Sequence, residues 1–325
     1  MTSRAETQSH SVKVSLNSRQ IKMIIHNEPP VEHRQDLPVD PDPYQEMIRE
    51  LNSMVGLENV KELVFRIYAM LKVNQMREKA GLKPSKQVHH MIFYGNPGTG
   101  KTTVARALAK LFHKMGLLSK GHLIEADRAD LVGEYIGHTA QKTRELVKKA
   151  LGGVLFVDEA YALARGGEKD FGKESIDTFV KMMEDHRDEF VLILAGYPSE
   201  MQQFIAINPG LPSRFPIQLE FPDYSLDELM QIAKGMTEER QYAMSESAEL
   251  KVKSILQKEK DNRFLNFSNA RYVRNVIEGS IRNHAARLLR QSLSPSLQDL
   301  QMLRAEDIHR PDSPQPAAPF LLPLE

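Results

Sequence analysis

Short apolar runs alternate with amphipathic segments between residues 89 and 197, and this alternation limits the folds open to the chain. The runs have the length of strands, whereas the segments between them repeat apolar residues at helical spacing. In chain order the runs are HHMIFY (89–94), GHLIEA (121–126), GGVLFVDEA (152–160) and EFVLILAGY (189–197). Near-continuous apolar strands separated by helices form parallel sheets that are covered on both faces. We therefore predict an α/β fold with a parallel sheet.

The regions around these runs divide the chain further. Residues 28–43 hold five prolines in 16 positions, which excludes a regular helix or central strand, although VKVSL upstream has the pattern of a strand. Ser225 forms a predicted capping box with Glu228, and further helical patterns follow, the last capped by Ser268. The predicted parts are a flexible extension at 1–45, the α/β domain at 46–222, a small all-helical domain at 223–310 and a disordered, proline-rich tail at 311–325.

Composition excludes several kinds of function. Lys+Arg and Asp+Glu both number 43, so no net charge favours nucleic acid or a membrane surface. The chain has no cysteine, which excludes disulfides, thiol catalysis and cysteine-bound metals. No apolar run reaches the ~18 residues of a membrane span, and the N-terminus lacks the apolar core of a secretory signal. We expect a cytoplasmic protein that does not contact a membrane.

The segment FYGNPGTGKTT, residues 93–103, contains the P-loop pattern G-x-x-x-x-G-K-[ST]. It follows a predicted strand and opens a predicted helix, which is the context that the pattern requires. Glycines let successive backbone N–H groups turn inward, so that they form an anion site at the positive end of a helix. Lys101 is expected to reach the β- and γ-phosphates, and the Thr102 hydroxyl to bind Mg²⁺. The predicted nucleotide-binding residues are Gly95, Asn96, Pro97, Gly98, Thr99, Gly100, Lys101, Thr102 and Thr103.

Two acidic residues at the end of the third apolar run indicate which reaction the P-loop serves. A P-loop alone is compatible with a kinase, a GTPase or an ATPase. Asp158 and Glu159 follow VLFV, at the strand edge where α/β sheets bind their ligands. Asp158 is expected to hold Mg²⁺, and Glu159 to act as general base on a water at the γ-phosphate. The pair favours ATP hydrolysis with Mg²⁺, the alternative being an ordinary acidic pair at a strand end.

With these motifs, residues from about 54 to 308 resemble an AAA+ ATPase. More narrowly, they resemble the family that contains the Rubisco activases of red-lineage and proteobacterial organisms and a sporulation ATPase of Bacillus. The resemblance implies an AAA+ module followed by a helical lid. It also implies a hexameric homo-oligomeric ring that hydrolyses Mg-ATP to remodel a protein partner, with a role in spore formation.

The resemblance implies further nucleotide-site residues. In MVGLENVKE, Val55 and Gly56 would lie against adenine, although Gly56 is also explained as a helix breaker. In NPGLPSRF, Arg214 corresponds to an arginine finger that reaches the γ-phosphate held by the neighbouring subunit. In NFSNARYVRNVIE, Arg271 corresponds to the sensor-2 arginine, and Arg274 shares much of its helix face as the competing assignment.

A third implied feature is a pore loop in LVGEYIGHT, formed by Tyr135, Ile136 and Gly137. An aromatic ring there would grip an extended polypeptide, and glycine would let the loop move. The alternative for Tyr135 is packing in the core. One departure from the family concerns Tyr197, which stands where AAA+ proteins carry a polar sensor-1 residue.

Two other functions stay open at this point. Six arginines and one acid between Arg263 and Arg290 are compatible with a DNA-directed AAA+ motor. The zero net charge, the aromatic pore loop and the lack of an added DNA-binding module argue against nucleic acid as the partner. An ATP-switched assembly scaffold with little hydrolysis is the other alternative, and the intact Asp158–Glu159 pair argues against it.

Overall fold

The chain forms two compact units in the computed structural model, residues 1–41 and residues 42–325. The residues that the structure describes are 11–17, 20–26, 48–49, 51–52, 54–84, 88–135, 137–165, 170–262, 267–291 and 294–311. In the first unit, β1 (Ser11–Asn17) and β2 (Gln20–His26) pair as an antiparallel hairpin. The strand expected at VKVSL is therefore confirmed.

The second unit is built on a five-stranded sheet in the order β4-β5-β6-β3-β7, and every pairing in it is parallel. The four strands expected from the apolar runs are present. Beside them the structure has a fifth strand, β7, at the edge next to β3. The strands are β3 (Met91–Gly95), β4 (Leu123–Ala126), β5 (Val154–Val157), β6 (Val191–Gly196) and β7 (Ile217–Phe221).

Strand β7 was missed because its sequence, IQLEF, alternates instead of being continuously apolar. Leu219 and Phe221 are buried, whereas Gln218 and Glu220 are exposed. An edge strand with one exposed face needs only this period-two pattern. The Tyr94 hydroxyl donates to Gln218 Oε1 at 2.9 Å, which ties the polar face of β7 to β3.

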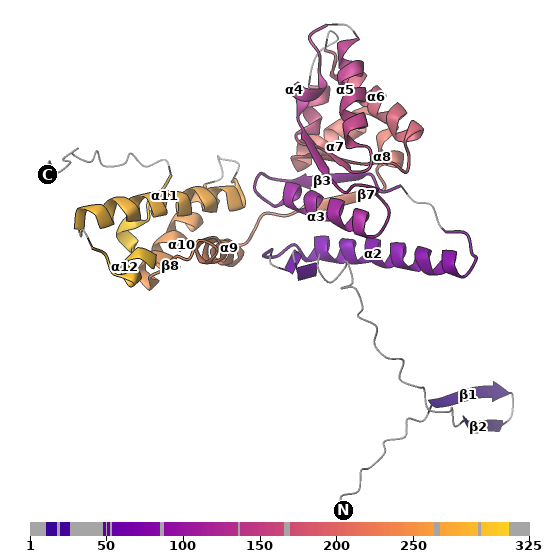
Figure 1. Cartoon of the computed structure of the whole chain (residues 1–325), viewed down its shortest axis with the longest axis horizontal. Coiled ribbons are helices and arrows are strands. Elements are labelled where there is room, and N and C mark those ends of the chain that lie inside the picture. Colours follow the sequence, from indigo (N-terminus) through magenta and orange to yellow (C-terminus); the bar gives the residue numbers. More distant parts are fainter. Residues whose placement is uncertain are drawn as a thin grey trace, which may run out of the picture. The chain divides into compact units, whose positions relative to one another are not determined.

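Helices cover both faces of the sheet (Figure 1). Met91 and Phe93 of β3 pack in one core cluster with α2 and α3, whereas Ile92 packs in the other with α5, α6 and α7. The helices before β7 are α2 (Glu58–Lys79), α3 (Lys101–Lys114), α4 (Arg128–Leu131), α5 (His138–Ala150), η1 (Ala160–Ala164), α6 (Gly172–Asp185), α7 (Pro198–Ile207) and α8 (Leu211–Arg214). None of the helices in the described residues is long and apolar enough to cross a membrane.

A helical region, the predicted lid, follows β7. Ser225 and Glu228 form the expected capping box at the start of α9, and α11 begins one residue after the expected cap. The region also contains a ladder of two-residue strands, β8 and β9, that the prediction of an all-helical domain did not include. Its elements are α9 (Leu226–Glu238), β8 (Ala243–Met244), α10 (Glu246–Asp261), α11 (Asn269–Gln291), α12 (Leu297–Gln301), β9 (Met302–Leu303) and η2 (Ala305–Asp307).

Candidate functional site

The P-loop segment forms a tight turn between the end of β3 and the start of α3. Gly98 and Gly100 have φ values of 71° and 97°, in the left-handed region that glycine adopts without steric cost. The Thr99 hydroxyl donates to the Asn96 carbonyl at 2.8 Å and closes the turn. The turn leads directly into the first residue of α3, so that it lies at the positive end of a 14-residue helix.

Lys101 is held inside this turn. Its ammonium donates to the carbonyls of Gly95 at 2.7 Å and Asn96 at 2.8 Å, and the residue is only 9% exposed. Burial lowers the pKa of Lys101, an effect that the negative charge of Asp158 opposes and the positive charge of Arg271 reinforces. A buried ammonium is stabilised by a nearby anion. The lysine is therefore well placed to receive a phosphate group.

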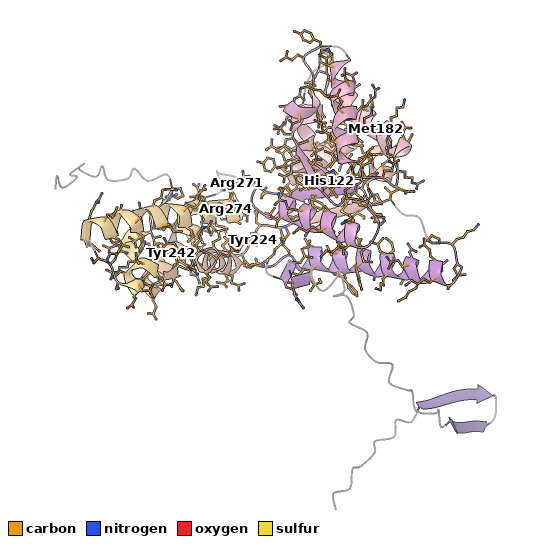
Figure 2. The ribbon with its side chains drawn as sticks, in the orientation of Figure 1. His122, Met182, Tyr224, Tyr242, Arg271 and Arg274 are labelled. Carbon is orange, nitrogen blue, oxygen red and sulfur yellow. The ribbon has the colours of Figure 1, made fainter. Side chains whose placement is uncertain are left out.

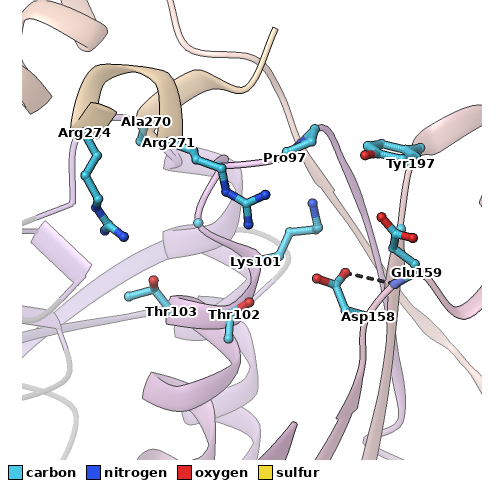
Figure 3. Close-up of a pocket in the computed structure, with 13 residues that line it drawn as sticks. Pro97, Lys101, Thr102, Thr103, Asp158, Glu159, Tyr197, Ala270, Arg271 and Arg274 are labelled. Carbon is cyan, nitrogen blue, oxygen red and sulfur yellow. Dashed lines mark hydrogen bonds between the residues drawn. The ribbon is translucent and has the colours of Figure 1, made fainter. Parts of the chain in front are cut away.

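A cavity of about 270 Å³ opens beside the turn, and Figure 3 shows the side chains around it. It brings together segments that lie far apart in the sequence, including the carboxyl ends of β3, β5 and β6. Ligands of open α/β sheets bind at this edge. The lining residues are Pro97, Gly98, Gly100, Lys101, Thr102, Thr103, Asp158, Glu159, Gly196, Tyr197, Ala270, Arg271 and Arg274.

The two acidic residues lie on the side of the cavity opposite the lid arginines (Figure 3). The backbone N–H of Glu159 donates to Asp158 Oδ1 at 3.0 Å. Glu159 has a φ of 48°, an uncommon backbone conformation for a residue other than glycine. Such a conformation persists only where the surroundings enforce it, and it is frequent at functional sites.

Tyr197 lies above the Glu159 carboxylate in Figure 3, directly after β6. Its ring stacks on Tyr161 with the centroids 5.7 Å apart. Burial raises the pKa of Tyr197, and the charges of Glu159 and Asp158 raise it further, so its hydroxyl stays protonated and can donate a hydrogen bond. The structure thus places Tyr197 in the cavity; its sensor-1 role stays a prediction.

The lid contributes two arginines to the cavity, Arg271 and Arg274, from the first turns of α11. Figure 2 labels both near Tyr224, at the end of the lid that meets the P-loop. In Figure 3 the Arg271 guanidinium points toward Lys101, and that of Arg274 points toward Thr103. Because both line the cavity, the choice of sensor-2 arginine between them stays open.

The segment expected against adenine, Val55 and Gly56, lies behind the P-loop rather than in this cavity. Neither Val55 nor Gly56 lines the cavity described above. Gly56 has a φ of 67°, and a Cβ there would collide with the Glu228 carboxylate. Leu57 approaches Gly100, where its side chain would lie 3.6 Å from an added Cβ. This segment therefore packs behind the P-loop, and its contact with adenine stays a prediction.

Arg214 is also outside this cavity. It ends α8, and its guanidinium donates to Glu184 at 2.6 Å and to the Gly210 carbonyl at 2.9 Å. With His90, Glu184 and Arg187 it lines a separate cavity of about 380 Å³. The structure does not bring Arg214 to the P-loop of its own chain.

Tyr135 is exposed to solvent. Its relative exposure is 65%, which contradicts the alternative of a core-packing tyrosine. Among the described aromatic pairs its ring is paired only with that of His138, in a T-shaped arrangement with the centroids 5.3 Å apart. Gly137 has a φ of 83° with open space around it. The remaining pore-loop residue, Ile136, lies outside the described residues.

Two polar residues beside the cavity were not singled out from the sequence. Asn269, at the start of α11, is 0% exposed. Its Nδ2 donates to Asp223 Oδ1 at 2.7 Å, and both oxygens of Asp223 accept from Asn96 Nδ2 at 3.0 Å. Segments more than 170 positions apart meet here, because Asn269 Nδ2 also donates to the Pro97 backbone carbonyl at 3.4 Å. No local sequence pattern indicates such contacts.

Comparisons with known proteins agree with this geometry. Residues 91–223 match the ATPase family associated with various cellular activities (AAA), and residues 225–318 match the AAA lid domain. Stage V sporulation protein K of Bacillus subtilis (strain 168) is 59% identical over 267 residues, covering 81% of this chain and 82% of the relative. Protein CbbX of Cereibacter sphaeroides is 43% identical, covering 81% of this chain and 86% of the relative.

The chloroplastic ribulose bisphosphate carboxylase/oxygenase activase of Cyanidioschyzon merolae (strain NIES-3377 / 10D) is likewise 43% identical, covering 81% of this chain and 90% of the relative. These matches confirm the resemblance inferred from the P-loop and the acidic pair, and they confirm a P-loop α/β module followed by a lid. The chain therefore belongs to the AAA ATPases, in the family that contains stage V sporulation protein K, protein CbbX and this activase.

Proposed function

We propose that the chain binds Mg-ATP in the cavity between the P-loop and the lid, hydrolyses the ATP, and uses the cycle to remodel a protein partner. The observation that carries this proposal is the meeting of Lys101, Thr102, Asp158, Glu159 and Arg271 around one cavity. Together these side chains supply a phosphate-binding cation, oxygen ligands for Mg²⁺, a general base and a sensor of the nucleotide. That set is the one ATP hydrolysis requires.

The residues fit the metal and the nucleotide. A hydroxyl from Thr102 and a carboxylate from Asp158 are the oxygen donors that Mg²⁺ prefers, and bound Mg²⁺ supplies positive charge to the phosphate oxygens. Lys101 neutralises the β- and γ-phosphates, which in turn offset the cost of burying its ammonium. Glu159 takes the proton from the attacking water, and Tyr197 beside it holds the orientation of that water.

We further propose a homo-oligomeric ring, a hexamer, in which Arg214 acts on the nucleotide of the next subunit. The position of Arg214 outside its own cavity supports this arrangement. Its present partner is Glu184, and both side chains are partly exposed. An exposed ion pair contributes little free energy, so exchange of Glu184 for a phosphate is inexpensive. Contacts between two different faces of one chain generate such rings.

The exposure of Tyr135 supports a polypeptide as the substrate. The ring of Tyr135 is free to pack against an extended chain, and Gly137 gives the loop freedom to move. The name of one relative, an activase of ribulose bisphosphate carboxylase/oxygenase, also gives a protein as the target. We also propose that the protein acts in the cytoplasm during spore formation, a proposal that the similarity to stage V sporulation protein K supports.

A subunit-mixing experiment tests the shared active site. Each proposed site joins the P-loop of one subunit to Arg214 of the next. Lys101→Ala removes the P-loop half of this site and Arg214→Ala removes the finger half, so each variant alone is expected to lose most ATP turnover. In a 1:1 mixture, about a quarter of the interfaces join an intact P-loop to an intact finger, if subunits exchange at random around a closed ring. The mixture should therefore regain up to that share of the wild-type rate.

Two controls sharpen this result. Arg187→Ala removes another arginine beside the same cavity as Arg214, and it should keep most of the turnover. Light scattering must show that the mixed subunits assemble. If assembled mixtures never recover activity, Arg214 does not act between subunits. Stimulation by an unfolded protein such as reduced casein, and not by DNA, is expected for a protein remodeller; the reverse would overturn that part of the proposal.

A further inference from the structure

The first turn of α11 is fastened to the P-loop by Asn269, which lies in the sensor-2 segment NFSNARYVRNVIE but was given no role there. Its side chain is fully buried, at 0% exposure. Its φ of 45° places the backbone in the left-handed region, which asparagine tolerates better than most residues. Arg271 follows two positions later, so the direction in which α11 starts determines where its guanidinium lies in the cavity.

The amide of Asn269 bonds to three parts of the fold at once. Its Oδ1 accepts from the backbone N–H of Tyr224 at 3.0 Å, in the segment that joins β7 to α9. Its Nδ2 donates to Asp223 at 2.7 Å and to the carbonyl of Pro97, in the P-loop, at 3.4 Å. A further contact at 3.2 Å reaches the Phe267 carbonyl, just before α11. A fully satisfied buried amide of this kind fixes one arrangement of its partners.

Neighbouring contacts reinforce the same junction. Asp223 also accepts from Asn96 of the P-loop. The backbone N–H of Ala270 donates to the Gly98 carbonyl at 3.2 Å. The hydroxyl of Tyr224 donates to the Thr99 carbonyl at 3.2 Å. Three segments that are separate in the sequence, the P-loop, the connection after β7 and the start of α11, are therefore bonded directly to one another.

We propose that Asn269 is a positioning residue that sets Arg271 against the nucleotide by fixing the first turn of α11 to the P-loop. The inference rests on the proposed function, because it requires Arg271 to contact bound ATP. Without the amide, α11 retains one backbone bond to the P-loop, from Ala270 to Gly98, about which its first turn can rotate. The Arg271 guanidinium then samples orientations that do not face the phosphates, and nucleotide affinity falls.

A double-mutant cycle tests this inference. Asn269→Gly removes the amide and keeps a residue that adopts the left-handed backbone. Affinity for Mg²⁺ with a non-hydrolysable ATP analogue is measured by calorimetry for Asn269→Gly, Arg271→Ala and the double variant. Each single variant is expected to weaken binding about tenfold, and the double variant to bind no more weakly than Arg271→Ala, since interacting residues are not additive.

A third variant separates positioning from simple loss of stability. Val252→Ala leaves a hole in the buried core of the lid, on α10 and away from the P-loop. It should lower the melting temperature at least as much as Asn269→Gly, with nucleotide affinity unchanged. If Val252→Ala weakens binding as strongly, the effect of Asn269 is one of lid stability and the inference is wrong.

The remaining outcomes are also decisive. Wild-type affinity in Asn269→Gly, or additive losses in the double variant, would overturn the positioning role and leave the proposed function intact. Unchanged affinity in Arg271→Ala would instead remove Arg271 from the proposed nucleotide site, and the inference about Asn269 would fail with it.

Discussion

We expect His90 to make the stability of the fold depend on pH. It precedes β3, is 2% exposed, and packs between the rings of Phe190 and Phe215 at centroid distances of 5.5 and 6.0 Å. Its Nδ1 accepts from the backbone N–H of Leu192 at 3.0 Å, and Nε2 has no hydrogen-bond partner among the described residues. Protonation would put a donor on Nδ1, so it would break this bond and bury a charge.

These surroundings lower the pKa of His90 from 6.5 to about 4, chiefly through burial and further through the positive charges of His89 and Arg187. In the unfolded chain the pKa is near 6.5, so between these two values the unfolded state binds more protons than the folded state. The contribution of neutral His90 to the unfolding free energy is therefore fully present above pH 6.5 and is lost as the pH falls toward 4. At 1.36 kcal/mol per pKa unit, the total loss is about 3 kcal/mol, of which about 2.5 kcal/mol falls between pH 7.5 and 4.5.

The assay is urea unfolding of the wild type and of His90→Asn at several pH values in this range. Asparagine keeps an acceptor for the Leu192 N–H and cannot titrate. The acidic groups and His89 therefore contribute equally to the pH dependence of the unfolding free energy in both proteins. The unfolding free energy of the wild type should therefore fall by about 2.5 kcal/mol more than that of the variant on acidification. Equal pH dependence in the two proteins would refute a buried, neutral His90.

Three further outcomes are expected. Glu159→Gln should bind ATP but hydrolyse it at least ~100-fold more slowly, and a wild-type rate would exclude Glu159 as the base. Tyr135→Ala should change the unfolding free energy by less than about 0.5 kcal/mol because the side chain is exposed, and should abolish stimulation by an unfolded protein that Tyr135→Phe retains; a large loss of stability would contradict the pore-loop role. Gly98→Ala should weaken ATP binding, because its Cβ would lie 2.7 Å from the Arg271 backbone nitrogen and closer still to Ser268. Gly116→Ala has the same left-handed backbone in open space and should not weaken binding.

Local sequence patterns predicted the parts of the fold whose structure depends on residues adjacent in the sequence. The P-loop, the acidic pair and four strands have their signal within ten or so positions, because glycine spacing and apolar continuity are local properties. Strand β7 was missed since its alternation is short and follows Pro216. Two-residue strands such as β8 carry no pattern at all.

The parts that the sequence did not predict depend on contacts between distant segments. Nothing in the sequence around Asn269 indicates that its amide reaches Pro97, which lies 172 positions earlier. The sequence also could not decide whether Arg271 or Arg274 is the sensor-2 arginine, because both lie on one face of α11. The structure leaves the choice open, since both side chains line the cavity. The exposure of Tyr135 also needed the structure, since an aromatic residue after a strand is compatible with either burial or exposure.

The order of strands has a consequence for synthesis of the chain on the ribosome. Strand β3, which leads into the P-loop, pairs only with β6 and β7, and both are made after it. About a hundred positions separate Gly95 from Val191, which at 5–20 residues per second is a delay of about 5–20 seconds. During that time an apolar strand has neither neighbour, whereas β4 and β5 can already pair. A ribosome that stalls before residue 191 would therefore hold a nascent chain with an uncovered strand, the kind of surface that chaperones bind.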